Sequence, residues 1–397
     1  MRRSYKFRLR PTKKQEAALN ACLEDTRQLY NAALEERREA WRMGHHQVTF
    51  YSQSTQLKKI RADDPERYDR WSFACERAAI RRLDRAFHAF FHRVKAGRKP
   101  GYPRFKGRGW WDSIEWPAMK GGARWDSVPH PKATHVYLFG IGHVRVHQHR
   151  PVDGRVKTIT AKREGDRWYV VLSCDDVPTK PLEPTGSAVG IDLGVASFAT
   201  TSTGAHVPNP RHLAATAGRL ATAQRDLARK ECGSKRRKKT AAKVAMLHGK
   251  VRRQRLDHAH KTALALVRSH DLIVHEDLAI TDMTKRSKPR SDGNGGYQPN
   301  RAAAKTGLNK SIQDAGWGIF LRILTAKAES AGRRVIAIDP RHTSQRCAQC
   351  RHTAAGNRAT RAEFRCLACG HQANADVNAA INILRAGLAL QGARSAT

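Results

Sequence analysis

Apolar and polar positions in the first 100 residues follow two different periods. Residues 4–10 alternate between apolar and basic side chains, which is the pattern of a half-exposed β-strand. From Lys13 to about Met43, apolar residues return every three or four positions, which predicts one long helix. A second helical block is expected from about Ser54 to Ala96, with an interruption near Pro65. The N-terminal part is therefore predicted to be one strand followed by helices.

Short segments of β-type sequence occupy the following stretch of chain. Glycines and charged turns separate them, and strands at such spacing are typical of a small β-barrel. The predicted strands are residues 113–116, 135–139, 143–147, 157–163 and 167–174. We expect the strand at residues 4–10 to belong to this barrel, with the helices inserted after it, and residues 178–186 to form a linker.

From residue 187 the pattern changes to alternating strands and helices. Continuous apolar runs predict buried strands, and amphipathic or basic runs predict helices between them. The predicted strands are residues 188–193, 197–203, 271–276 and 333–338, and the predicted helices are residues 210–268, 311–331 and 376–388. The basic run Lys235–Lys239 is expected in a connection, and residues 281–307, with Asp292-Gly293-Asn294-Gly295-Gly296, in a loop. This half of the chain is predicted to be an α/β domain.

Charge is the strongest signal in the composition. The 397 residues include 74 Lys and Arg against 35 Asp and Glu, a net charge of +39. Residues 1–110 hold 27 basic and 12 acidic side chains, and residues 216–269 hold 16 and 3. Positive charge spread over separate regions indicates a polyanionic partner, and favours a large RNA or more than one nucleic-acid strand. A nonspecific RNA-binding protein of ribosomal type is the alternative at this point.

One predicted helix face carries part of that charge. Arg77, Arg81, Arg82 and Arg85 surround the apolar face of the second helical block. Such a face is either solvated surface or a nucleic-acid contact, and the global charge favours the contact.

The chain shows no signal peptide and no stretch of roughly 18 apolar residues that could span a membrane. We therefore expect a cytoplasmic protein. Four scattered cysteines, Cys22, Cys75, Cys174 and Cys232, are expected to be buried, reduced thiols, which fits a reducing compartment.

The other four cysteines have the spacing of a metal site. Cys347-Ala-Gln-Cys350 is followed after fifteen residues by Cys366-Leu-Ala-Cys369. Two such pairs are typical of a tetrahedral zinc site with four thiolate ligands. Because all four positions are filled by protein, the predicted Zn²⁺ is structural and not catalytic.

Three acidic residues lie where predicted elements begin or end. Asp192 lies in Val189-Gly190-Ile191-Asp192-Leu193-Gly194, Glu276 ends a buried strand, and Asp376 starts the last helix. Carboxylates grouped in this way hold two divalent ions about 3.5–4 Å apart, which activate water for phosphodiester hydrolysis. Taken singly, each acid is more often a turn former or a helix cap. The glycine-flanked Asp192 also resembles the phosphate-binding strand of actin-like ATPases.

Together these features resemble the TnpB (OrfB-type) RNA-guided endonucleases that insertion sequences encode, which are relatives of type V CRISPR effectors. The resemblance covers the whole chain and is densest from residue 187 onward. Besides the three acid motifs, the matching stretches are Lys6–Ala33, Leu308–Phe320 with its Asp-Ala-Gly-Trp, Thr343–Cys350 and Asn374–Leu384.

The resemblance implies a multidomain α+β and α/β fold. An RNase H-like (RuvC) nuclease domain with a Cys₄ zinc-ribbon insert would follow a small wedge-type β-barrel with an inserted helical recognition domain. The implied boundaries are 1–11 for the first barrel strand, 12–100 for the helical domain, 101–182 for the rest of the barrel, 183–342 for the nuclease domain, 343–372 for the zinc insert and 373–397 for the final helix and tail.

The resemblance also implies the chemistry and the partners. By position, Asp192, Glu276 and Asp376 are the ligands of two catalytic Mg²⁺ ions, and one structural Zn²⁺ is bound by Cys347, Cys350, Cys366 and Cys369. The partners would be a transposon-derived guide RNA and double-stranded target DNA, with a short motif beside the target recognised by protein. A monomer is favoured. Residues that read the flanking motif are sought within 50–125.

Two positions depart from the family pattern. Members often have Asp-Arg-Asp in the third motif, where this chain has Asn374-Ala375-Asp376, and the lost arginine is expected to weaken a contact to the nucleic-acid backbone. Arg351 stands where a glycine is common after the first cysteine pair, while Gly370 follows the second pair.

Three other functions share parts of this pattern. A miniature type V CRISPR effector would have the same fold and chemistry. An RNA-guided DNA-binding regulator is disfavoured because all three acids are present. A cut-and-paste transposase with a different acidic triad is disfavoured by the Cys₄ insert and by the Asp-Val-Asn-Ala-Ala helix.

Overall fold

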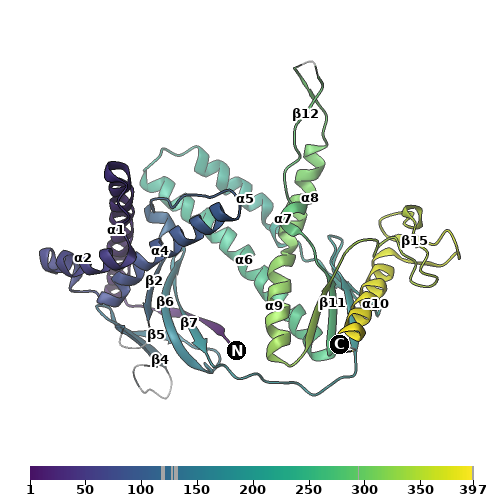
Figure 1. Ribbon diagram of the computed structural model, residues 1–397, viewed down its shortest axis with the longest axis horizontal. Helices are drawn as coiled ribbons and strands as arrows, with labels where there is room; N and C mark the ends of the chain where they lie inside the picture. The colour runs from purple at the N-terminus through teal and green to yellow at the C-terminus, as the bar shows by residue number, and fades with distance from the viewer. Residues whose placement is uncertain (118–120, 127, 129–132, 294, 396–397) are drawn as a thin grey trace. The chain divides into compact units, whose positions relative to one another are not determined.

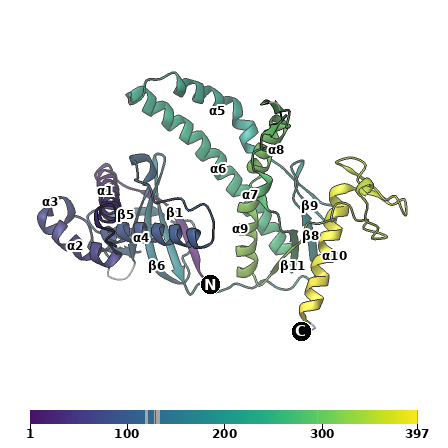
Figure 2. The ribbon, with the colours of Figure 1, turned by 45° about the horizontal axis from the view of Figure 1, so that its top comes forward.

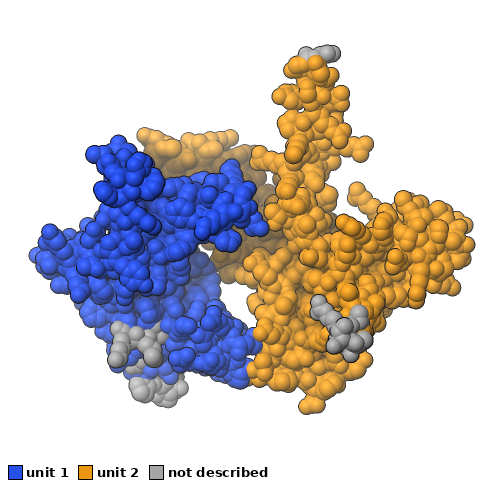
Figure 3. All heavy atoms as spheres, in the orientation of Figure 1, with its two compact units in different colours: residues 1–178 blue, residues 179–397 orange. Residues whose placement is uncertain are grey.

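The computed structural model of the chain describes residues 1–117, 121–126, 128, 133–293 and 295–395. These residues form two compact units, Met1–Pro178 and Thr179–Thr397, which Figure 3 shows in different colours. Each unit has its own sheet and its own hydrophobic core, so each is described by itself.

The first unit is built on a seven-stranded antiparallel sheet (Figure 1). Its strands are β1 (Arg3–Arg10), β2 (Ser113–Pro117), β3 (Ala123–Trp125), β4 (Thr134–Leu138), β5 (Gly142–His147), β6 (Arg155–Glu164) and β7 (Arg167–Asp175), in the order β2-β6-β7-β1-β5-β4-β3. The predicted N-terminal strand is thus confirmed and lies in the middle of the sheet. Its alternating residues Tyr5, Phe7 and Leu9 are buried because successive side chains of a strand point to opposite faces. The short strand β3 was not predicted; it also approaches β6, so the sheet wraps toward a barrel.

Four helices are inserted between β1 and β2. They are α1 (Lys13–Gly44), α2 (Phe50–Asp63), α3 (Pro65–Tyr68) and α4 (Phe73–Lys95). Thr12 caps α1 through a capping box with Gln15, and the long helix is confirmed within one residue of its predicted end. The second block begins earlier than predicted, because Thr49 caps α2, and its interruption extends to Ser72, which caps α4.

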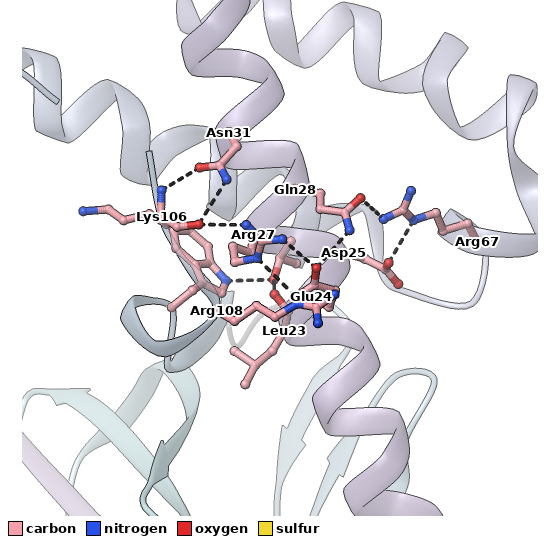
Figure 4. Close-up of polar contacts among 11 residues, drawn as sticks. Leu23, Glu24, Asp25, Arg27, Gln28, Asn31, Arg67, Lys106 and Arg108 are labelled. Carbon is pink, nitrogen blue, oxygen red and sulfur yellow. Dashed lines mark hydrogen bonds and ion pairs between the residues drawn. The ribbon is translucent and has the colours of Figure 1, made fainter. Parts of the chain in front are cut away.

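Polar side chains of α1 form hydrogen bonds with the backbone of the segment that follows α4. The side chains of Arg27 and Asn31 donate hydrogen bonds to the Lys106 carbonyl oxygen at 2.7 and 3.1 Å, and the Lys106 N–H donates to Asn31 (Figure 4). On the neighbouring side of α1, buried Asp25 accepts a hydrogen bond from Arg67 at 2.8 Å. The segment that leads through Lys106 to the short helix η1 (Arg108–Trp110) is therefore held on α1 at its backbone.

Part of the basic face predicted on α4 is turned inward. The Arg82 guanidinium stacks 3.8 Å from the centre of the Trp111 ring and donates to the Ser113 carbonyl oxygen. Arg85 forms an ion pair with Glu115 at 3.1 Å. Arg82 is thus bound within the fold, while the nucleic-acid contact of this face stays a prediction. The predicted motif-reading stretch 50–125 also includes residues 118–120, which lie outside the described residues.

The second unit is built on a five-stranded mixed sheet. Its strands are β8 (Ala188–Asp192), β9 (Ser197–Thr201), β10 (His206–Pro208), β11 (Leu272–Glu276) and β14 (Arg334–Ile338), in the order β10-β9-β8-β11-β14. Strands β8, β11 and β14 are parallel, whereas β9 is antiparallel to β8 and β10 is antiparallel to β9. The predicted α/β organisation of this half is confirmed.

Helices cover both faces of this sheet. On one face, α6 (Lys235–Ser269) and α9 (Trp317–Ser330) pack on Ile273 and its neighbours in one apolar cluster. On the other face, α10 (Ala375–Ser395) packs on Leu272 and Val274 in a second cluster (Figure 1). Alternate residues of β11 therefore face opposite layers, as the pleat of a strand requires.

The basic helical region differs from its prediction. Instead of one helical stretch over 210–268, α5 (His212–Ala228) and α6 form an antiparallel hairpin (Figure 2). The run Lys235–Lys239 is not in the connection but in the first turns of α6, because the Ser234 side chain caps that helix. Cys232, predicted to be buried, is exposed between the two helices, whereas Cys22, Cys75 and Cys174 are buried as predicted.

The predicted loop at 281–307 contains regular structure. It holds most of α7 (Ile280–Met283), the hairpin strands β12 (Arg290–Ser291) and β13 (Tyr297–Gln298), and the start of α8 (Ala302–Ala315). Asn294 lies outside the described residues. The helix predicted over 311–331 is divided, because Gly316 has a φ of +73°, a conformation that ends α8 and that glycine adopts readily.

The segment between β14 and α10 is folded around the cysteines. It contains η2 (Ala355–Asn357), β15 (Glu363–Arg365) and β16 (Gln372–Asn374), which is paired with β15. Among the helices of the described chain, none combines the length and the apolar character that crossing a bilayer requires.

Candidate functional site

The sheet of the second unit brings two of the predicted acids together. Parallel strands β8 and β11 are in register, with Val274 opposite Gly190, and both end at the same edge of the sheet. Asp192 and Glu276 each lie two residues beyond these partners, so their side chains point to the same face at the same level. That face is the one that α10 covers.

The third acid comes from the start of α10. Asp376 lies in the first turn of this helix, and the Asn374 side-chain oxygen accepts hydrogen bonds from the N–H groups of Asp376 and Val377 at 3.0 and 3.2 Å. Asn374 therefore caps the helix in the place of the family's usual aspartate. The start of α10 is thereby fixed over the edge where Asp192 and Glu276 lie.

The three carboxyls act on one another electrostatically. Burial, together with the charges of Glu276 and Asp376, raises the pKa of Asp192 to about 7. Burial also raises the pKa of Glu276, against the lowering effects of a hydrogen bond from Thr343 and of the Arg358 charge. Crowded, part-buried carboxyls of this kind favour a bound cation, which would relieve both the repulsion and the loss of hydration.

Two residues at the acidic site were missed from the sequence. The Thr343 hydroxyl donates a hydrogen bond to Glu276 Oε1 at 2.5 Å, and the Arg358 guanidinium lies 3.4 Å from Asp376 Oδ1. Arg358 also lowers the pKa values of Asp192 and Glu276, so it lies near all three carboxyls. Thr343 begins one of the matching stretches, a signal that could have drawn attention to it, whereas nothing in the sequence marks Arg358.

The environment of Ala375 explains the departure in the third motif. Its side chain is fully buried in a small cluster with Cys347, Phe364 and Cys366. An arginine there would have to leave this cluster, because its charge has no partner in it. The guanidinium beside the acids is instead supplied by Arg358, from the loop that follows η2.

The four predicted zinc ligands form a compact group. The sulfur atoms of Cys347 and Cys369 lie 3.7 Å apart, those of Cys350 and Cys366 lie 3.5 Å apart, and all four lie within 4.8 Å of one another. Tetrahedral Zn–S bonds of about 2.3 Å place sulfur atoms roughly 3.8 Å apart, so the group fits Zn²⁺. Among the described residues, no other set of three or more candidate ligands is this tight; the three acids are more widely spaced.

Buried asparagines connect this cysteine group to the acidic site. The Asn378 side-chain oxygen accepts from the Ala348 N–H, its amide donates to the Arg346 carbonyl oxygen, and Asn382 donates to the carbonyl oxygen of Thr343. Both asparagines belong to α10, two and six residues after Asp376. The same helix thus positions Asp376, the first cysteine pair and the threonine that contacts Glu276.

Asp314, in the matching Asp-Ala-Gly-Trp stretch, has a separate place in the structure. Its carboxylate accepts hydrogen bonds from the N–H groups of Leu213 and Ala214 and pairs with Arg255 at 2.6 Å. It therefore holds the start of α5 and the middle of α6, and it is structural.

Comparisons with known proteins agree with this architecture. Three family models match: one described as "Probable transposase" (the OrfB family of IS605) over residues 169–287, a "Cas12f1-like, TNB domain" over 317–383, and a "Helix-turn-helix domain" over 1–46. Residues 1–46 here form the strand β1 and the single helix α1. A solved structure titled "Cryo-EM structure of the Cas12f1-sgRNA-target DNA complex" has a TM-score of 0.58 at 16% identity, covering 93% of this chain and 82% of that one.

The fold and the two sites together define an RNase H-like (RuvC) nuclease fold with a Cys₄ insert, preceded by a barrel-type sheet with inserted helices. The relative named "Putative RNA-guided DNA endonuclease InsQ" from Escherichia coli K12 is 33% identical over 98% of this chain and 92% of its own length. One from Streptomyces pristinaespiralis, named "Putative RNA-guided DNA endonuclease", is 32% identical over 98% and 90%. The chain belongs to the TnpB (OrfB-type) family of transposon-encoded proteins.

Proposed function

We propose that this chain is an RNA-guided DNA endonuclease whose active site is formed by Asp192, Glu276 and Asp376. The observation that carries the proposal is the meeting of these acids, two at the ends of adjacent parallel strands and one at the start of α10. The names of the full-length relatives from Escherichia coli and Streptomyces pristinaespiralis support the same function.

The acids fit a pair of Mg²⁺ ions, since carboxylate oxygens are the ligands that this ion prefers. Such ions, when bound, supply activation of water and stabilisation of the departing oxygen of a phosphodiester. The chain's own part is to hold the ligands. Thr343 fixes one oxygen of Glu276 by its hydrogen bond, and Asn374 fixes the backbone at Asp376.

Arg358 is proposed to neutralise part of the negative charge of the three carboxylates and of a bound phosphate. Its side chain is about one-third exposed and lies 3.4 Å from Asp376 Oδ1, so it is accessible to a phosphate of the scissile strand. Since an arginine can bind a phosphate oxygen while remaining near a carboxylate, it can orient that strand against the acids.

The cysteine group is proposed to hold one structural Zn²⁺. Because the segment between β14 and α10 has little core of its own, the metal would supply much of its folding free energy. Elemental analysis should find one zinc per chain, and replacement of any one of the four cysteines should loosen the metal. Active protein without zinc would contradict this.

We also propose a separate role for each of the two units, from the same relatives and the same fold. The barrel-type sheet and its inserted helices would bind the guide RNA and read the motif beside the target, and the second unit would cut. RNA–DNA pairing would supply the remaining specificity.

The test is separate replacement of each acid by alanine. Each of Asp192→Ala, Glu276→Ala and Asp376→Ala should abolish cleavage in Mg²⁺ while RNA and target binding remain near wild type, because these acids bind cations and not phosphate. Asp257→Ala, an exposed acid on α6, is the control and should cut normally. If any of the three variants cut at a near wild-type rate, the assignment is wrong.

The same assay separates the alternatives. Wild-type protein that binds a guided target without cutting would indicate an RNA-guided regulator. Cutting that persists at one site after removal of RNA would indicate a transposase that reads DNA directly.

A further inference from the structure

The helical part of the first unit contains a cavity of about 840 Å³. It is lined by the C-terminal end of α1, the loop after it, the start of α2 and the C-terminal half of α4, together with Tyr102. Its size lies in the upper part of the range for small-molecule sites, roughly 300–1,000 Å³. None of the family motifs or acids described above lies in it.

Exposed aromatic side chains are concentrated here. Among the described residues, eight large aromatic side chains are exposed, and four of them line this one cavity: Trp41, Tyr51, Phe91 and Tyr102. Trp41 is 58% exposed and Tyr51 is 75% exposed. Exposed apolar surface is costly in water, and its concentration in one concave place indicates a binding site.

The aromatic walls are held in place. Tyr102 makes edge contacts with the rings of Phe87 and Phe90, at centroid distances of 5.5 and 5.3 Å. The chain after Tyr102 is pinned at Lys106 by Arg27 and Asn31 of α1 (Figure 4). A ligand would therefore meet a preorganised wall and would not have to order it.

The charge of the lining is suited to a polyanion. Arg37 and Arg81 are opposed by one carboxylate, that of Asp84, which is already paired with Arg37 at 3.4 Å. The Arg81 guanidinium stacks 4.4 Å from the centre of the Phe50 ring, and within the described part of the chain no carboxylate is paired with it. Its N–H groups are thus available to a phosphate beside a stacked base.

We propose that this aromatic groove binds unpaired bases of the guide RNA by stacking them on Trp41 and Tyr51. Flat aromatic walls with cationic groups beside them suit single-stranded nucleic acid, because every base has a π-face and each nucleotide carries a phosphate. Duplexes keep their bases stacked on one another, so no base face inside them is open to a protein ring. The identity of the RNA rests on the proposed function; the preference for unpaired bases does not.

RNA is favoured over DNA as the occupant for an energetic reason. A folded RNA already contains loops with unpaired bases, which proteins recognise by stacking. Duplex DNA presents unpaired bases only after strand separation, which costs on the order of 1.4 kcal/mol for each base-pair step. The groove can therefore be filled by RNA before any target is bound.

The experiment uses full-length, RNA-free protein carrying Asp192→Asn, so that no probe is cut. Three labelled probes of the same length and sequence are compared: single-stranded RNA, blunt double-stranded RNA and single-stranded DNA. Trp41→Ala and Tyr51→Ala should each weaken binding of single-stranded RNA by about 5-fold or more, since loss of a stacking ring typically weakens binding by roughly 5- to 150-fold. Trp41→Phe and Tyr51→Phe should restore most of the affinity.

The controls are aromatic residues with similar exposure elsewhere. Trp110→Ala and Tyr297→Ala, 82% and 75% exposed, should leave single-stranded RNA binding unchanged. Duplex RNA should bind all variants alike. An unchanged affinity of the groove variants for single-stranded RNA, or an equal loss for duplex RNA, would overturn the proposal. Single-stranded DNA bound as tightly as RNA, with the same loss in the variants, would overturn the choice of RNA.

Because no cleavage is measured, this result is independent of the acids. Failure of the alanine test on Asp192 would reject the proposed nuclease and leave the groove standing. Failure of the binding test would reject the groove alone.

Discussion

Asp192 lies in surroundings that oppose its own ionisation. Burial and two neighbouring acids hold its pKa near 7, far above the value of about 4 for a free aspartate. In the absence of a cation, the ionised site therefore destabilises the fold at neutral pH. Such a conflict between stability and charge is common where a protein binds metal.

Asp192→Asn is therefore expected to stabilise the metal-free protein at pH 8 while abolishing cleavage. The folded-state pKa is raised, so the wild-type carboxyl favours folding most below about pH 4 and loses that contribution as pH rises through 7. At pH 8 the free energy of unfolding of the variant should exceed that of wild type by about 1 kcal/mol or more. Each kcal/mol should raise the Tm by roughly 2–4 °C, and the difference should disappear by pH 4. Thermal unfolding in EDTA at both pH values measures this.

The control is Asp257→Asn, which removes an exposed charge of α6 and should change little. A gain for Asp192→Asn that is as large at pH 4 as at pH 8 would show that the stabilisation does not come from ionisation.

The two cysteine turns differ at one residue for a conformational reason. Arg351 and Gly370 occupy equivalent places after the two pairs, with φ of +67° and +72°. The N–H of each donates to the carbonyl oxygen of the first cysteine of its pair. An L-residue pays roughly 1 kcal/mol or more for this left-handed conformation, whereas glycine does not.

Arg351→Gly should therefore stabilise the cysteine segment by about 1 kcal/mol, seen as slower zinc release to a chelator. Gly370→Ala should have the opposite effect at the matching position. Equal rates for wild type and Arg351→Gly would mean that the arginine side chain offsets the strain by contacts of its own.

At the scale of elements, the acidic site depends on how closely α10 approaches the sheet. A Cβ at Gly190 would collide with the carbonyl oxygen of Ala380, and a Cβ at Gly387 would collide with the Val274 side chain. Gly190 is thus required by contact between backbone and helix. Gly190 lies in β8, two residues before Asp192. The close contact between Gly190 and α10 therefore also sets the distance between Asp192 and the start of α10.

Gly190→Ala is expected to cost about 2 kcal/mol or more in stability and to reduce cleavage strongly, because the helix must move away from the sheet. The matched control is Gly218→Ala in the exposed part of α5, where a Cβ meets nothing; it should stabilise by roughly 0.5–1 kcal/mol. Thermal unfolding and a plasmid-cleavage assay measure the pair. Normal cleavage by a destabilised Gly190→Ala would show that the acids do not depend on this contact.

At the scale of the whole molecule, charge dominates. The net charge of +39 is spread along the chain, with 15 more basic than acidic side chains in residues 1–110 and 13 more in residues 216–269. Without a polyanion these charges repel one another, and a bound RNA would neutralise many of them.

Cleavage should therefore follow an RNA guide. RNA-free protein should bind duplex DNA weakly, without preference and with affinity that falls steeply as salt rises. On one plasmid with two targets, exchange of the guide should move the cut from one target to the other. A cut that stays at one site, or that survives RNase treatment, would contradict this.

The sequence by itself determined the elements with the clearest local pattern. Alternation in residues 4–10, helical spacing from Lys13, the apolar runs before Asp192 and Glu276, and the spacing of the four cysteines each predicted an element that the structure contains. These features are readable because a strand has a period of two and a helix of 3.6, and because a tetrahedral metal needs four ligands on two tight turns.

Only the tertiary structure decided which distant residues meet. Arg358 lies beside Asp376, Thr343 contacts Glu276, Ala375 is enclosed by the cysteine cluster, and Arg82 is turned onto Trp111. The sequence analysis also did not predict that a helix ends at Gly316, or that Trp41, Tyr51 and Tyr102 line one cavity. None of these contacts has a period or a fixed spacing, since each is set by how separate elements pack, and packing depends on the shape and charge of side chains far apart in the chain.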